Sequence, residues 1–231
     1  MSSFYAGVCI SSIKPTYGPD SNGIVRFHEN DGTGDKAMFI HLVREIGDIS
    51  RSSGSKEFEA TVIDYTKAKE IIERENSSKV KLVPLFCVHG FFVEPNALFN
   101  KLNPKIQTFV QGEKYYPVPV LWPCRTNKYL GGPGKNYGID QTTTSQSAGV
   151  LFKQMADLVP NDHWPNKALM MHSMGNHVVF NGACATKTPD AKFDDIFMVA
   201  AVSALLSIPY LHIVIFNIST HIHTPSSQIG Y

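Results

Sequence analysis

One serine of the chain stands in a context that could make it a nucleophile. Ser173 lies between a short apolar run, Ala168–Met170, and a helix-like segment that begins after Gly175. A serine on a sharp strand-to-helix turn exposes its hydroxyl, and the N–H of the next residue can then receive the oxygen of a reacting carbonyl. Small residues flank such a serine because strand and helix pass close together; Gly175 is one, whereas Met171 stands where the usual pattern has glycine. The segment MHSMGN therefore predicts a nucleophile elbow.

A histidine–glycine pair after a second apolar run could complete this site. The run covers Leu82–Val88, and His89, Gly90 and Phe91 follow it, far upstream of Ser173. An ordinary strand-ending turn is the alternative interpretation. The interval between the two motifs accommodates the helix, strand, helix and strand that a doubly wound sheet would place there.

The elements of that interval can be placed from periodicity. Residues 94–109 have helical spacing of apolar side chains, and residues 118–122 are typical of a strand. A helix is expected to begin at Asp140, which would cap it, after a loop at Leu130–Lys135 that lacks the full phosphate-loop spacing. One apolar face of this helix consists of Ala148, Leu151, Phe152, Met155, Leu158 and Val159.

Together the motifs VHGF, LWPC and HSMGN resemble the α/β-hydrolases, and in particular the family once grouped as DUF900. The resemblance covers roughly Val80 to Ala201. It implies an α/β fold with a mostly parallel sheet flanked by helices. It also implies that the backbone N–H groups of Phe91 and Met174 form an oxyanion hole beside Ser173. Two fixed donors at that point stabilise the transition state more than the ground state.

A general base and an acid for Ser173 are harder to find. In this fold they follow the serine in the order acid, histidine. The carboxylates after Ser173 are Asp190, Asp194 and Asp195, and all precede the apolar run 196–201. A strand there would put them at its amino end, whereas sites in such sheets lie at carboxyl ends. We therefore assign none of them to the site.

Five histidines also follow or flank the serine. His172 and His177 are expected to pack or to hydrogen-bond, and not to act as bases. His212 lies in an apolar stretch, while His221 and His223 lie in a Ser/Thr-rich tail and would have to fold back to reach Ser173. The site thus has a serine and an oxyanion hole, with base and acid unassigned.

The last part of the chain departs from the resemblance at about Val202. We expect three parts: an N-terminal extension over 1–79, a hydrolase-like core over 80–201, and a divergent apolar and Ser/Thr-rich tail over 202–231 that leaves the C-terminal strands and helices incomplete. Residues 196–218 carry no formal charge and are long enough to cross a bilayer as a helix, so a membrane anchor is the less favoured alternative.

The N-terminal extension shows two local patterns. Ile24–His28 and Met38–Leu42 alternate like strands around a glycine-rich turn, Asp31–Asp35, which predicts a β-hairpin and not a metal loop. A helix is expected over residues 64–75, with Asp64 as its cap.

Composition sets the outer limits. The formal net charge of +1 gives no reason to expect nucleic acid. No cysteine pair has metal-ligand spacing, so Cys9, Cys87, Cys124 and Cys184 are interpreted as buried small apolar side chains, and no cofactor or metal is expected. No secretory signal is evident, which favours the cytoplasm.

The sequence therefore predicts a serine hydrolase-like protein acting on a small-molecule ester, thioester or amide. It leaves turnover, substrate and oligomeric state open. The alternative is a noncatalytic hydrolase-like or truncated product that binds a ligand or partner.

Overall fold

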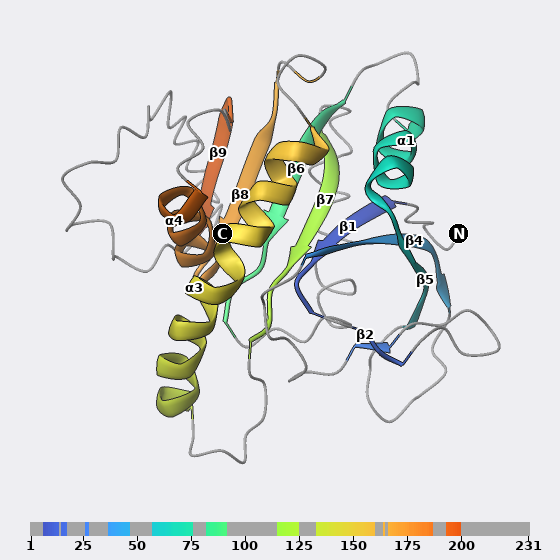
Figure 1. Ribbon diagram of the computed structural model, residues 1–231. Coiled ribbons are helices and arrows are strands. Elements are labelled where there is room, and N and C mark those ends of the chain that lie inside the picture. Colours follow the sequence, from blue (N-terminus) through green and yellow to red (C-terminus); the bar gives the residue numbers. More distant parts are fainter. Residues whose placement is uncertain are drawn as a thin grey trace, which may run out of the picture.

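A computed structural model describes residues 7–13, 15–17, 26–27, 37–46, 57–75, 82–91, 115–124, 133–159, 164, 166–186 and 193–199. These residues form an α/β fold around a seven-stranded, mostly parallel sheet (Figure 1). Its strands are β1 (Gly7–Ser11), β4 (Met38–Ile46), β5 (Glu57–Ile63), β6 (Val83–Val88), β7 (Tyr115–Leu121), β8 (Ala168–His172) and β9 (Asp195–Val199). The described helices are α1 (Tyr65–Glu75), α3 (Pro133–Leu158) and α4 (Gly175–Thr186).

The order of the strands is β5-β4-β1-β7-β6-β8-β9. Strands β1, β7, β6, β8 and β9 run parallel, and β4 and β5 are antiparallel additions at the β1 side. From β6 the chain adds β7 on one side and then returns to the other side for β8 and β9. The order therefore reverses between β6 and β8, and ligands of such sheets bind outside the carboxyl ends of the strands at this point.

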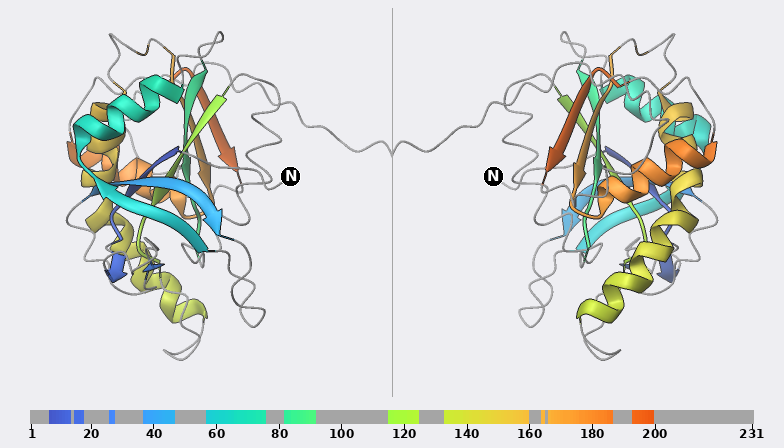
Figure 2. Two further views of the ribbon diagram at one scale, coloured as in Figure 1. Left: turned by 90° about the vertical axis from the view of Figure 1, so that its right-hand side faces the viewer. Right: turned by 90° about the vertical axis from the view of Figure 1, so that its left-hand side faces the viewer.

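All three described helices cover the same face of the sheet (Figure 2). The apolar face that the sequence predicted for α3 is confirmed, because all six of its residues are buried in the main core. Alternate residues of β6 and β8, such as Phe86, Val88 and Leu169, belong to the same core.

Helix α1 begins as predicted. The Asp64 carboxylate accepts the N–H of Lys67 at 2.8 Å, which satisfies one of the unpaired donors of the first turn. Ala68, Ile71 and Ile72 are buried, so the helix turns one apolar stripe to the core and its charges to water.

Strand pairing in the N-terminal part differs from the predicted hairpin. β3 (Arg26–Phe27) pairs with β2 (Pro15–Tyr17) in a separate two-stranded sheet, while β4 pairs with β1 and β5. The hairpin prediction is wrong because β1, buried along its whole length, offers β4 a register of five residue pairs. Three strands from the first 79 residues thus extend the same sheet as β6 to β9, and the division at residue 80 stays a prediction.

The start of α3 also differs from the prediction. The helix begins at Pro133, so Asp140 lies within it and does not cap it. Proline is favourable in the first helical position, since its missing N–H would have no partner there. The predicted loop at Leu130–Lys135 therefore overlaps the first turn of the helix.

Three of the four cysteines are buried as predicted, at positions 9, 87 and 124, whereas Cys184 is exposed on α4. Burial raises the pKa of the Cys87 thiol to about 12. In the described part of the chain no helix is long and apolar enough to cross a bilayer. The predicted helix over 94–109, the turn at Asp31–Asp35 and the tail over 202–231 lie outside the described residues.

Candidate active site

Ser173 lies on the turn that joins β8 to α4, at the carboxyl end of the sheet. Its φ of 48° places it in the left-handed region, and no other non-glycine residue in the described segments has a positive φ. Such a conformation costs on the order of 1–3 kcal/mol and persists where neighbouring contacts enforce it. Here the N–H and the side-chain amide of Asn176 both donate to the Ser173 carbonyl, at 3.1 and 2.7 Å, and the Ser173 N–H donates to Val199 at 2.9 Å.

Two glycines allow the motifs to approach each other. A Cβ on Gly90 would lie 2.5 Å from His172 Nδ1 and 3.0 Å from Ser173 Cβ. A Cβ on Gly175 would lie 2.7 Å from the carbonyl oxygens of both Val88 and His89. The structure therefore brings together the two segments that the sequence connected only by motif, at the point between β6 and β8 where the strand order reverses.

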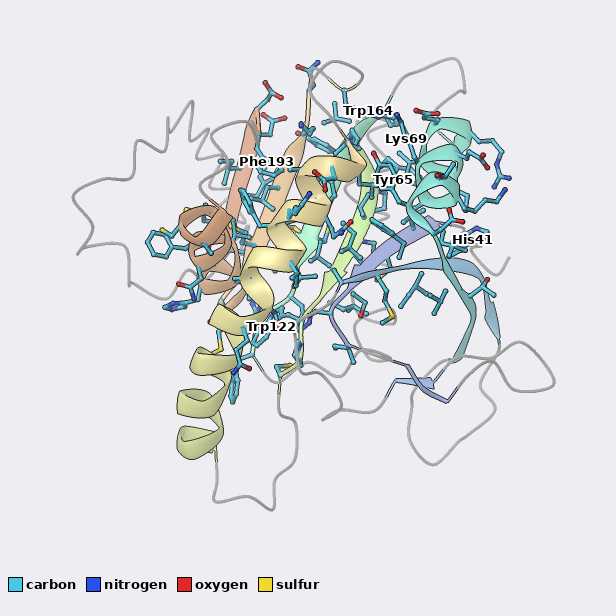
Figure 3. The ribbon with its side chains drawn as sticks, viewed as in Figure 1. His41, Tyr65, Lys69, Trp122, Trp164 and Phe193 are labelled. Atoms are coloured by element: carbon cyan, nitrogen blue, oxygen red, sulfur yellow. The ribbon has the colours of Figure 1, made fainter. Side chains whose placement is uncertain are left out.

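His89 is buried beneath this contact and stacks on Trp122, with ring centroids 5.2 Å apart and planes 7° from parallel. Figure 3 shows Trp122 at the end of the sheet opposite Trp164. The backbone N–H of Trp122 donates to His89 Nε2 at 3.1 Å, so Nε2 carries no proton. Nδ1 therefore carries the proton and donates to the Gly90 carbonyl at 2.9 Å.

Both ring nitrogens of His89 are thus occupied. Burial lowers the pKa of His89 to about 4, which keeps the ring neutral near neutral pH. A histidine held in this way cannot take a proton from Ser173. Sequence reasoning assigned no role to this side chain or to Trp122, although both lie in the motifs VHGF and LWPC.

The backbone N–H of Met174 is available at the start of α4. Within the described segments this N–H donates no hydrogen bond, while the Met174 carbonyl accepts from His177 and Val178. The first N–H groups of a helix have no partner inside the helix and carry a partial positive charge. Met174 therefore offers a donor in the residue after Ser173, where the family resemblance implies one of the two oxyanion N–H groups.

The carboxylates of Asp194 and Asp195, at the start of β9, lie at the other end of the sheet. Asp195 begins β9 opposite Ala168, and the far end of the strand, at Val199, pairs with His172. Four residue steps of a strand separate the two ends by roughly 13 Å. Asp194 and Asp195 cannot contact Ser173 from there, as their positions in the sequence indicated.

The histidines beside the serine differ from each other. His172 is exposed, and its Nδ1 lies against Gly90. His177 is partly buried, and its Nε2 has no hydrogen-bond partner among the described atoms. Asp190, His212, His221 and His223 lie outside the described residues.

Across the described segments no group of three His, Cys, Asp or Glu side chains could hold a metal ion. Comparison with protein-family models, with curated proteins and with solved structures found no match to this chain. What the structure itself defines is an α/β protein with a strained serine at the switch point of its sheet.

Proposed function

We propose that the chain is a serine hydrolase-like protein of the α/β-hydrolase type. Ser173 is the nucleophile, and the N–H groups of Phe91 and Met174 receive the oxyanion. The observation that carries the proposal is the left-handed φ of 48° at Ser173, on a strand-to-helix turn in contact with Gly90. Strain of this kind at a serine concentrates at functional sites. We also propose that the chain is related to the DUF900 group of α/β-hydrolases.

In this proposal the Ser173 oxygen attacks the carbonyl carbon of a small ester, thioester or amide in the cytoplasm. The carbonyl π electrons move to oxygen, and the tetrahedral oxyanion accepts hydrogen bonds from the two backbone donors. Collapse of this intermediate expels the alcohol, thiol or amine and leaves an acyl group on Ser173. Water then releases the acid by the same route.

The proton of the Ser173 hydroxyl needs an acceptor. His89 is excluded by its two hydrogen bonds, and the carboxylates at the start of β9 are excluded by position. The sequence leaves His221 and His223 as candidates for this acceptor, and both lie outside the described residues. Without such a base the same scaffold would be a noncatalytic binding protein. This is the second candidate function, and it is favoured by the lack of an acid–histidine pair beside Ser173 in the described segments.

A burst experiment tests the proposal. The purified chain is mixed with p-nitrophenyl acetate, and release of p-nitrophenolate is followed through the first turnover. We expect a burst close to one equivalent of protein, because the acyl group stays on the serine. Ser173→Ala should abolish it.

Ser147→Ala is the matched control. Ser147 is buried in α3 with no partner for its hydroxyl among the described atoms, so its removal leaves the fold and the burst intact. A burst that survives in Ser173→Ala would refute the nucleophile. A folded wild-type protein with no burst would favour the noncatalytic candidate.

A further inference from the structure

At the carboxyl end of β6 and β7, the stacked pair of His89 and Trp122 takes the place of a backbone hydrogen bond between the two strands. Strands β6 and β7 are paired up to Val88 and Val120. Beyond that point the backbone N–H of Trp122 is bound by the side chain of His89 and not by the backbone of β6. In return, the indole N–H of Trp122 donates to the His89 carbonyl at 2.7 Å. The backbone after His89 can therefore turn away from the direction of β6, while His89 itself stays hydrogen-bonded to the end of β7.

The other ring nitrogen of His89 acts on the next peptide unit. Nδ1–H donates to the carbonyl of Gly90, and this carbonyl shares one planar unit with the N–H of Phe91. The described peptide bonds include no cis bond, so the carbonyl and the N–H of that unit point in opposite directions. Holding the carbonyl fixes the direction of the Phe91 N–H.

That direction follows from the order of the strands. His89 is tied to Trp122 on the β7 side of β6, and Ser173 follows β8 on the opposite side. A Gly90 carbonyl held toward the ring of His89 therefore turns the Phe91 N–H toward the β8 side. The contact of Gly90 with Ser173 brings this peptide next to the serine.

We propose that His89 is a positioning residue that holds the Gly90–Phe91 peptide with its N–H directed at the oxyanion site of Ser173, and that Trp122 keeps His89 in place through the bond from its indole N–H to the His89 carbonyl. The inference rests on the proposed function of Ser173. It adds that one of the two backbone donors is set by a buried side-chain pair, whereas the other, Met174, is set by the start of α4.

An alternative is that the pair serves only the packing of the core. The two roles can be separated because His89 makes two different hydrogen bonds. In His89→Asn the amide nitrogen occupies the place of Nδ1 and keeps the bond to Gly90, but the bond from Trp122 is lost. In His89→Gln the amide oxygen reaches the place of Nε2 and keeps the bond from Trp122, but the bond to Gly90 is lost.

The first readout is the rate of covalent reaction with a fluorophosphonate probe at saturating concentration, measured on the full chain. We expect His89→Asn to react within about threefold of wild type and His89→Gln to react roughly 10- to 100-fold more slowly, since loss of an aligned oxyanion donor costs about that or more. The half-saturating probe concentration should stay the same in both. Equal losses in the two variants, or a larger loss in His89→Asn, would overturn the proposal.

The second readout does not depend on activity. In ¹⁵N-labelled protein the amide signal of Phe91 reports the environment of that peptide. We expect it to shift and to exchange faster with solvent in His89→Gln and to stay near its wild-type position in His89→Asn. An unmoved Phe91 signal in His89→Gln would overturn the proposal. Failure of Ser173 to react in wild type, with the Phe91 signal behaving as expected, would instead refute the proposed function and leave the positioning role standing.

Discussion

The two ends of the central sheet both carry polar groups, but they use them differently. At the amino end the groups bind one another: Tyr115 donates to Asp195 at 2.8 Å, and Asp194 exchanges hydrogen bonds with the backbone of Lys167. The buried Lys167 ammonium donates to the Val159 carbonyl at 2.7 Å. At the carboxyl end Ser173 is strained, and the Met174 N–H has no partner in the described segments.

This difference separates an end whose polar groups bind one another from an end that keeps polar groups available for a ligand. Polar groups that satisfy each other lower the cost of burial and have nothing left for a ligand. At the carboxyl end, by contrast, the Met174 N–H and the Ser173 hydroxyl stay available to bind a ligand. By this criterion Asp194 and Asp195 stabilise the amino end of the sheet, and Ser173 marks the end where chemistry is expected.

The largest expected effect comes from filling the contact between the two motifs. In Gly175→Ala the new methyl would lie 2.7 Å from two backbone oxygens of β6 and the residue after it, so strand or helix must shift. We expect the free energy of unfolding to fall by about 3 kcal/mol. Urea unfolding followed by circular dichroism measures this change.

Gly149→Ala provides the control for that prediction. Its methyl would meet only Ala185, at 3.7 Å, in ordinary contact. Alanine in a helix interior is more favourable than glycine, so this variant should gain up to about 1 kcal/mol. Equal stability of the two variants would contradict the close packing of α4 on β6.

A second prediction concerns the pH dependence of stability. The pKa of His89 falls from 6.5 to about 4 on folding because the ring is buried. The unfolded chain therefore binds an extra proton between these values, and the free energy of unfolding falls as the pH drops through this window. The full loss is about 3 kcal/mol, reached near pH 4, and stability returns as the pH rises to 6.5.

His89→Asn has no ring to titrate, so the difference between wild type and variant isolates this contribution. Urea unfolding at intervals from pH 7 to pH 4 should show wild type losing more stability than the variant. Parallel curves for the two proteins would contradict a neutral, buried His89.

The smallest effect is expected at the amino end. In Asp195→Asn the amide oxygen can still accept from Tyr115, so the loss should be about 1 kcal/mol or less. The rate of fluorophosphonate labelling should not change. A marked fall in labelling, with stability preserved, would mean that the amino end takes part in the chemistry after all.

Much of the parallel core could be predicted from the sequence, because its strands are short continuous apolar runs and α3 has one clear apolar face. The pairing of the N-terminal strands could not. β1 is a five-residue run whose partners, β4 and β7, lie far along the chain. Its pairing with them depends on the assembled sheet and not on a local pattern. The start of α3 was misplaced because a favourable proline in the first turn outweighed the polar signal at Asp140.

The site divides in the same way. Ser173 could be found because the elbow is a local pattern of residues. The role of His89 could not, since its partner Trp122 is brought to it by the neighbouring strand and no local pattern encodes that contact. The motif located the proposed nucleophile, whereas the contact between His89 and Trp122 became visible only with the order of the strands.

The most direct test of the account is to locate the adduct that a fluorophosphonate forms with the folded protein. The probe is incubated with the full chain, and the modified peptide is identified by tandem mass spectrometry. A single adduct on Ser173 is predicted, since labelling requires a serine activated by its surroundings. An adduct on another residue, or a folded protein that stays unmodified, would contradict the claim that the carboxyl end of this sheet carries an activated nucleophile.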